Sequence, residues 1–222
     1  VKWFEARGIS QRTLIKMKIS EGPEWMPQTS KTENTIQFNY FINNELINIK
    51  YRDGRKNFKL VKGAEKVFYN LDSTVGHDYV VIVEGEMDAL SFVDAKIDSV
   101  VSVPNGATLN RLNLDYLDSC IEYFDDKSKI IIAVDSDEAG QNLQQELIRR
   151  FGAEVCYTIS FGEHKDANEF LLQHGSSMLK RLVDKASPVP LENVVTLKDV
   201  NEELQEFIHE GFKPGFQVGL DN

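Results

Sequence analysis

Cysteine is scarce in this 222-residue sequence, which contains only Cys120 and Cys156, far apart and both in apolar surroundings. Two cysteines exclude a four-cysteine zinc site within these residues and argue against a disulfide framework. We therefore expect a reducing, cytoplasmic location. The four histidines are sparse, and no cluster of them suggests a metal site.

Long apolar runs are also missing. No stretch approaches the roughly 20 residues needed to cross a bilayer, and the opening residues lack the apolar core of a signal peptide, so we expect no membrane partner. The sequence has no Gly-x-x-x-x-Gly-Lys-Ser/Thr phosphate loop, which excludes a helicase motor of that type within these residues. Because the first residue is Val1 rather than methionine, we expect a segment of a longer protein.

The net charge is −10, but the charges are distributed unevenly. Residues 1–62 hold 12 Lys or Arg and 6 Asp or Glu, whereas residues 63–222 hold 13 and 29. A basic segment attracts phosphates, and concentrated carboxylates can hold a divalent cation. Solvated surface charge accounts for the same asymmetry, so composition alone leaves both interpretations open.

Apolar periodicity predicts a small strand-rich segment followed by an α/β sheet. Residues 3–19 have the pattern of a short helix pair with Ser10 as an N-cap, and alternation predicts strands within 35–51 and at 57–60. Short Val- and Ile-rich strands are then predicted at 79–83, 99–103, 130–134 and 155–159. Helices are predicted at 87–95, 114–124, 138–151 and 167–173. This alternation indicates a parallel sheet with helices on both faces.

Three regions follow from these patterns. Residues 1–76 are predicted to form a basic, strand-rich (α+β) subdomain, and residues 77–186 the α/β domain. Residues 187–222 are predicted to be a linker and a polar helix around residues 200–209, because Ser187-Pro-Val-Pro is typical of a linker.

Acidic residues follow three of the four predicted parallel strands. Glu84 ends the first strand, Asp135 and Asp137 follow the third, and Asp166 follows the fourth. Because ligands of such sheets bind at the carboxyl ends of the strands, these carboxylates are expected to converge there as ligands for Mg²⁺ or Mn²⁺. Taken singly, Asp137 and Asp166 are equally well explained as helix N-caps, and Glu84 as part of a plain turn.

The residues resemble a known fold. Val-Ile-Val-Glu-Gly-Glu-Met-Asp at 81–88 and Ile-Ala-Val-Asp-Ser-Asp-Glu-Ala-Gly at 132–140 are similar to the signature of the Toprim fold, which primases, topoisomerases and some nucleases share. Lys-Asp-Ala-Asn-Glu at 165–169 resembles the version found in primases. The basic segment at 49–62 and the flanks at 7–10 and 211–215 resemble the phage T7-type primase–helicase.

This resemblance implies a DNA primase segment that joins ribonucleoside triphosphates into short RNA primers on a single-stranded DNA template. It implies two Mg²⁺ or Mn²⁺ ions, no zinc in this segment, and a helicase domain in the same longer chain. The implied catalytic residues are Glu84, Asp88, Asp135 and Asp137. The implied metal ligands are Glu84, Asp135, Asp137 and Asp166, with Glu84 alternatively a general base. The residues implied to bind nucleotide or template are Lys50, Arg52, Lys59 and Lys62.

Two alternatives use the same residues. A Toprim nuclease or topoisomerase subunit would cleave DNA with the same acids, although none of the seven tyrosines is marked as a nucleophile. A non-catalytic DNA-binding module of a replicative helicase would bind DNA without any metal-dependent activity. Neutralising Asp135 and Asp137 separates these hypotheses, because only an enzyme has an activity to lose.

Overall fold

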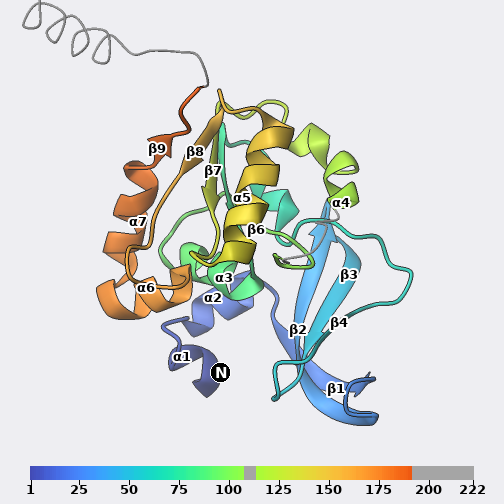
Figure 1. The fold of residues 1–222 in the computed structure, drawn as a ribbon. Coiled ribbons are helices and arrows are strands. Elements are labelled where there is room, and N and C mark those ends of the chain that lie inside the picture. Colours follow the sequence, from blue (N-terminus) through green and yellow to red (C-terminus); the bar gives the residue numbers. More distant parts are fainter. Residues whose placement is uncertain (108–113, 192–222) are drawn as a thin grey trace, which may run out of the picture. The chain divides into compact units, whose positions relative to one another are not determined.

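The chain folds around two β-sheets that share one hydrophobic core (Figure 1). The structure is a computed structural model, and it describes residues 1–107 and 114–191. Residues Val1–Val189 form one unit. Within the described ranges, no helix has both the length and the apolar character to cross a membrane. The predicted helix around residues 200–209 and the segment 211–215 lie outside the described residues.

The first sheet is antiparallel. In sheet order, its strands are β1 (Ser20–Met26), β2 (Lys31–Ile42), β3 (Glu45–Arg52) and β4 (Phe58–Leu60). Asn43 and Asn44 join β2 to β3 with positive φ at both residues, as a tight hairpin turn requires. The structure adds β1, which alternation does not predict because it contains Gly22 and Pro23. These residues are tolerated because β1 is an edge strand.

The second sheet has the predicted parallel architecture. Its strands are β5 (Tyr79–Val83), β6 (Val100–Ser102), β7 (Lys129–Ala133), β8 (Cys156–Thr158) and β9 (Ser187–Pro188). Their spatial order is β6-β5-β7-β8-β9, and only β9 is antiparallel to its neighbour. The sheet therefore extends two residues into the segment that the sequence assigned to a linker.

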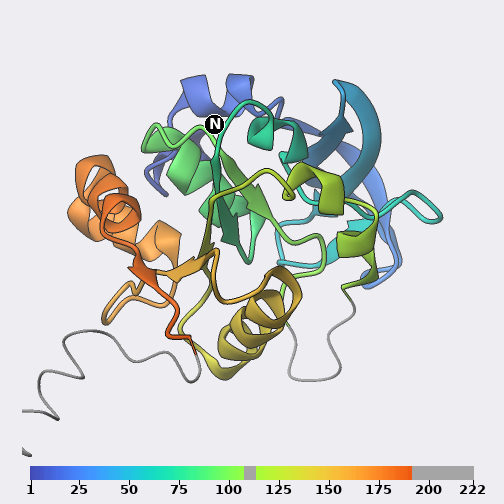
Figure 2. The ribbon, with the colours of Figure 1, turned by 90° about the horizontal axis from the view of Figure 1, so that it is seen from above.

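Helices cover both faces of this sheet, as predicted (Figure 2). On one face α3 (Glu86–Asp94), α6 (Ala167–His174) and α7 (Ser176–Asp184) contact one another, and α5 (Glu138–Phe151) covers the other face. The single helix predicted at 114–124 is instead α4 (Asp115–Asp118) followed by the 3₁₀ turn η2 (Ile121–Tyr123). The intervening Ser119 and Cys120 are weak helix formers, which explains the interruption. Another 3₁₀ turn, η1, spans Leu71–Thr74.

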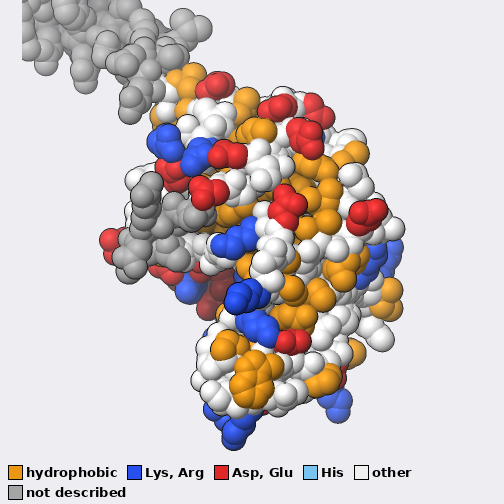
Figure 3. Space-filling model, turned by 90° about the vertical axis from the view of Figure 1, so that its right-hand side faces the viewer, with side chains coloured by type: hydrophobic (Ala, Val, Ile, Leu, Met, Phe, Trp, Pro, Cys, Tyr) orange, Lys and Arg blue, Asp and Glu red, His pale blue; other side chains and the backbone are white. Residues whose placement is uncertain are grey.

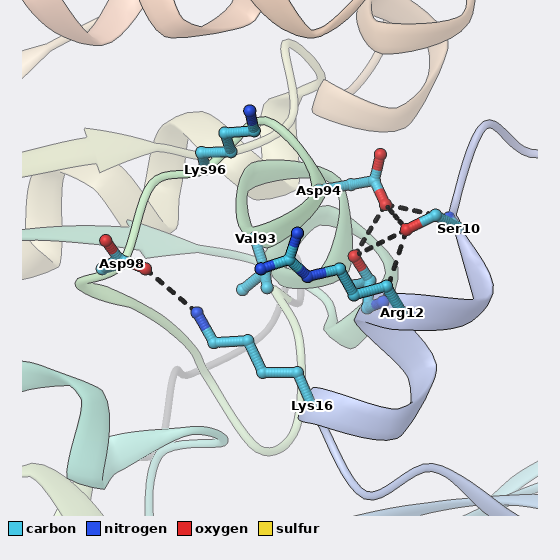
Figure 4. A pocket seen from close by; sticks show the side chains of 8 residues that line it. Ser10, Arg12, Lys16, Val93, Asp94, Lys96 and Asp98 are labelled. Carbon is cyan, nitrogen blue, oxygen red and sulfur yellow. Dashed lines mark hydrogen bonds and ion pairs between the residues drawn. The ribbon is translucent and has the colours of Figure 1, made fainter.

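Two short helices precede the first sheet: α1 (Lys2–Glu5) and α2 (Gln11–Lys16). Ser10 caps α2 by accepting a hydrogen bond from the Thr13 N–H, as predicted. Asp94, at the end of α3, accepts hydrogen bonds from the Ser10 N–H, the Ser10 hydroxyl and the Thr13 hydroxyl at 2.8, 2.6 and 2.6 Å (Figure 4). Beside them, Lys16 pairs with Asp98 at 3.0 Å. These contacts fix the start of the chain against α3.

Aromatic side chains join the two sheets. Phe38 and Tyr40 from β2 are fully buried, and both rings contact Tyr69, with centroid distances of 6.1 and 5.1 Å. The backbone of Tyr69 pairs with Ser102 of β6. The first sheet and the second therefore bury residues in one continuous core, although Met26 and Tyr51 of the first sheet are buried outside it. The region boundaries after residues 76 and 186 stay predictions.

Candidate metal and nucleotide site

Four of the predicted carboxylates lie at the carboxyl edge of the parallel sheet. Glu84 directly follows β5, Asp135 and Asp137 follow β7, and Asp166 lies between β8 and α6. The two later loops are joined because the Ser136 N–H donates a hydrogen bond to the Lys165 carbonyl at 3.0 Å. The strand order places β5, β7 and β8 side by side, so residues distant in sequence meet at one edge.

The pKa of Asp135 is shifted by burial and by its charged neighbours. Burial, followed by repulsion from Glu84 and Asp166, raises its pKa from an ordinary value near 4 to about 7. The Lys165 ammonium opposes this shift, and it lies 3.4 Å from Asp135 Oδ2 and 3.3 Å from Asp137 Oδ2. A single cation therefore lies between the two aspartates that the sequence predicts to bind metal.

Glu84 is held by one oxygen only. Its Oε1 atom accepts a hydrogen bond from the Ala107 N–H at 3.1 Å. Its Oε2 atom is buried and has no hydrogen-bond partner among the described residues. Burial is the main cause that raises the pKa of this carboxyl. A buried carboxylate oxygen without a donor is unfavourable, and coordination to a cation would compensate it.

Asp137 and Asp166 are both helix N-caps, as one interpretation of the sequence predicts. Asp137 Oδ1 accepts a hydrogen bond from the Gly140 N–H at 3.0 Å at the start of α5. Asp166 Oδ1 accepts one from the Glu169 N–H at 2.8 Å at the start of α6. The first of these bonds is the main cause that lowers the pKa of Asp137. Each cap uses one oxygen, and the second oxygen of Asp137 is paired with the Lys165 ammonium. Capping therefore does not exclude metal binding, but a metal ion at Asp137 would compete with Lys165.

The chemistry of these donors fits a hard divalent cation. Carboxylate oxygens are the preferred ligands of Mg²⁺ and Mn²⁺. The unsatisfied oxygen of Glu84, the raised pKa of Asp135 and the position of Lys165 all indicate a need for positive charge. However, in residues 1–107 and 114–191 no three or more His, Cys, Asp or Glu side chains are arranged to hold a metal ion.

Asp88 lies behind the edge rather than in it. Its side chain is buried, and it accepts a hydrogen bond from the Asn168 N–H at 3.3 Å. Burial, and then repulsion from Asp166 and Asp135, raises its pKa well above the ordinary range. Asn168 also donates to the Arg7 carbonyl at 2.9 Å and to the Ser91 hydroxyl at 3.0 Å. Sequence reasoning missed Asn168, whose signal was its place in the Lys-Asp-Ala-Asn-Glu motif.

Gly140 is a second residue that sequence reasoning left without a role. A Cβ atom at this position would lie 2.2 Å from the Asp135 carbonyl oxygen and 2.9 Å from its carbonyl carbon. Such distances are far inside van der Waals contact, so only glycine lets α5 pack directly against the backbone of Asp135. The spacing Asp-x-Asp-x-x-Gly is the signal that marks it.

The four predicted phosphate-binding cations lie in different environments. Lys50 is buried, and its ammonium is 2.8 Å from Glu86 Oε1. Arg52 is also buried, with its guanidinium 4.5 Å from the centre of the Trp3 ring. Lys59 pairs with Glu24, whereas Lys62 is exposed.

The same oxygen of Glu86 also accepts a hydrogen bond from the Tyr40 hydroxyl, so this acid links β2 and β3 to α3. Sequence reasoning assigned no role to Glu86, whose signal was the Glu-Gly-Glu motif. On the face drawn in Figure 3, Lys and Arg side chains lie close to carboxylates rather than in a separate patch. Cations and acids thus share this face of the molecule.

Comparisons with known proteins agree with the fold. Residues 81–171 match the family model described as Toprim-like. The chain is 35% identical over 208 residues to the primase homolog protein of Arabidopsis thaliana, a match that covers 86% of this chain and 60% of that protein. It is 31% identical over 239 residues to the chloroplastic/mitochondrial Twinkle homolog protein of A. thaliana, covering 99% of this chain and 33% of that protein.

Among solved structures, the chain resembles the primase fragment of the bacteriophage T7 primase-helicase protein. The TM-score is 0.68 at 26% identity, and the match covers 81% of this chain and 72% of that fragment. The sheet order, the acids at its carboxyl edge and the family match define a Toprim domain within the chain. In sequence and in fold, the chain is similar to the Toprim primases of the phage T7 type. It spans 33% and 60% of the two A. thaliana relatives.

Proposed function

We propose that this chain synthesises short RNA primers on single-stranded DNA by metal-dependent nucleotidyl transfer. The observation that carries the proposal is the group of carboxylates at the ends of β5, β7 and β8. Their mutual repulsion and burial raise the pKa of Asp135 to about 7, and a bound cation would relieve that repulsion. The similarity to the A. thaliana primase homolog and to the T7 primase fragment supports primer synthesis as the reaction.

The acids have distinct proposed roles. Asp135, Asp137 and Asp166 would hold two divalent ions, Mg²⁺ or Mn²⁺. Such ions neutralise the triphosphate and lower the pKa of the attacking 3′-hydroxyl. Glu84 either completes the metal site or accepts the proton of that hydroxyl, for which its raised pKa suits it. Asp88 positions the Asp166 loop through the Asn168 N–H.

The cations orient phosphates. The Lys165 side chain is 55% exposed, so its ammonium could leave Asp135 and Asp137 and bind a triphosphate oxygen if a metal ion neutralised those acids. Lys59 and Lys62 bind nucleotide or template phosphates from the first sheet. Lys50 and Arg52 are buried, so contact with phosphate requires Lys50 to exchange its Glu86 partner.

The proposed partners are a single-stranded DNA template, ribonucleoside triphosphates and a helicase domain in the same longer chain. The name of the T7 protein, a primase-helicase, supports the helicase domain, as does the short span of the Twinkle homolog that this chain covers. We also propose a cytoplasmic location, on the two free, buried cysteines.

Primer synthesis with labelled ribonucleotides on single-stranded DNA, with Mg²⁺ or Mn²⁺, tests the proposal. The 222-residue chain and the full-length protein are compared with the variant Asp135→Asn/Asp137→Asn. Asparagine retains the α5 cap, so loss of activity is not caused by loss of the helix end. The matched control is Asp98→Asn, at an exposed surface pair. DNA binding is measured in parallel by fluorescence anisotropy.

RNA products from the wild type and the control, but not from the double variant, are the expected result. Cleaved DNA without RNA would replace the proposal by a Toprim nuclease. DNA binding by the full-length protein without either product would support a non-catalytic binding module.

A further inference from the structure

A cavity of about 480 Å³ opens beside Asp135, on the β8 side of the sheet edge. Its walls come from the ends of β7 and β8, the first half of α5 and the start of β9. This volume lies within the roughly 300–1,000 Å³ typical of small-molecule sites. The proposed triphosphate site, by contrast, is formed by the carboxylates and Lys165. The cavity therefore adjoins the proposed metal site and shares Asp135 with it.

The cavity lining is polar but almost uncharged. Besides Asp135, it includes the side chains of Gln141, Gln144, Gln145 and Thr158. No Lys or Arg lines it, so it is unsuited to a phosphate. In the part of the chain that the structure describes, the amides of Gln144 and Gln145 make no hydrogen bond. Each amide offers a donor and an acceptor side by side.

Donor and acceptor pairs of this kind match the edges of nucleobases. Glutamine amides form paired hydrogen bonds with adenine, and a neutral lining does not repel a base. Gln144 and Gln145 are on α5, a regular 14-residue helix that is held at Asp135 by Gly140, so their distance from the proposed metal site is set by rigid structure. A nucleotide with its phosphates at Asp135 can direct its base into this cavity.

We propose that the cavity between α5 and β8 binds the nucleobase of a nucleotide whose phosphates lie at Asp135. The inference rests on the proposed function, because that function places phosphates there. Two sources offer the same chemistry, the incoming ribonucleotide and the DNA template strand. Gln144 and Gln145 are the residues that distinguish a base from other ligands by hydrogen bonding.

Binding is tested on the 222-residue chain with ¹⁵N-labelled glutamine, whose side-chain amide signals are assigned from Gln144→Leu and Gln145→Leu spectra. The probes are the four ribonucleosides, ATP with Mg²⁺, and a short single-stranded DNA. Shifts of both amides with nucleosides or ATP support a site for the incoming nucleotide. Shifts with DNA alone support a site for a template base. If no probe shifts either amide, the proposal is wrong. These outcomes do not depend on RNA synthesis, so they remain decisive even if primer synthesis fails.

Steady-state kinetics of primer synthesis provide the second arm. The variant Gln144→Leu/Gln145→Leu is expected to raise KM for ribonucleotides, or Kd for template, about tenfold (about 1.4 kcal/mol), because the amide hydrogen bonds to the base are lost. Its kcat at saturation should be unchanged. Gln173→Leu, at an exposed helix position outside the cavity, is the matched control and should match the wild type. Unchanged KM and Kd in the double variant would overturn the proposal.

Discussion

Replacing Lys50 by alanine should destabilise the protein far more than the loss of a surface lysine does. The Lys50 ammonium lies 2.8 Å from Glu86, and the two side chains are only 11% and 4% exposed. The Tyr40 hydroxyl donates to the same Glu86 oxygen. Without Lys50, a carboxylate would remain buried with one neutral donor from Tyr40 and no counter-charge.

Breaking a buried ion pair from one side costs about 3–5 kcal/mol. For a chain of this length, each kcal/mol lowers Tm by about 2–4 °C, so Lys50→Ala should lower Tm by about 6–20 °C. The control is Lys16→Ala. Lys16 pairs with Asp98 at 3.0 Å, but the side chains are 54% and 62% exposed, so its loss should cost less than about 1 kcal/mol.

Urea denaturation followed by circular dichroism measures both variants. The double variant Lys50→Met/Glu86→Gln should recover most of the lost stability, because it leaves no buried charge and keeps an acceptor for the Tyr40 hydroxyl. If the free energy of unfolding of Lys50→Ala lies within about 1 kcal/mol of the wild-type value, the argument from burial is refuted. Lys50 would then be free for the phosphate-binding role that the sequence predicts.

Three further predictions concern the site and its supports. Gly140→Ala should lower the free energy of unfolding by about 1–3 kcal/mol and abolish primer synthesis, because the added methyl would collide with the Asp135 backbone. Gly54→Ala is the control and should change neither property, because the space around Gly54 is open. Equal melting curves for Gly140→Ala and the wild type would contradict this prediction. In metal-free protein, the raised pKa of Asp135 stabilises the fold fully below about pH 4 and loses this contribution as the pH rises through about 7. The Tm of the wild type should therefore fall more between about pH 4 and pH 7 than the Tm of Asp135→Asn. An equal fall of Tm in both proteins would exclude the pKa shift. Asp94→Ala removes the acceptor of three hydrogen bonds and should lower the free energy of unfolding, measured by urea denaturation, by about 1–3 kcal/mol. The control Asp98→Ala should lower it by less than about 1 kcal/mol.

The structure confirms the predicted parallel sheet. The sheet could be predicted because the apolar patterns of its strands and helices are formed by consecutive residues. Four short apolar strands, separated by segments of helical periodicity, indicate one sheet whose ends must coincide. The positions of Glu84, Asp135 and Asp166 after these strands follow from that arrangement. Strands β1 and β9 escaped prediction because they contain proline or are very short, and only pairing with a neighbouring strand stabilises them.

The sequence by itself determined which acids stand at the carboxyl edge, since strand periodicity and strand ends are properties of consecutive residues. Only the tertiary structure decided how the charges are paired. No sequence pattern distinguishes Lys50 from an exposed lysine. It pairs with Glu86, which is 36 residues away in the sequence, because β3 packs against the start of α3. The same holds for Gln144 and Gln145, which become the lining of a cavity only when α5 lies beside β8. Burial and charge pairing depend on segments that the chain brings together from a distance, and no local pattern records them.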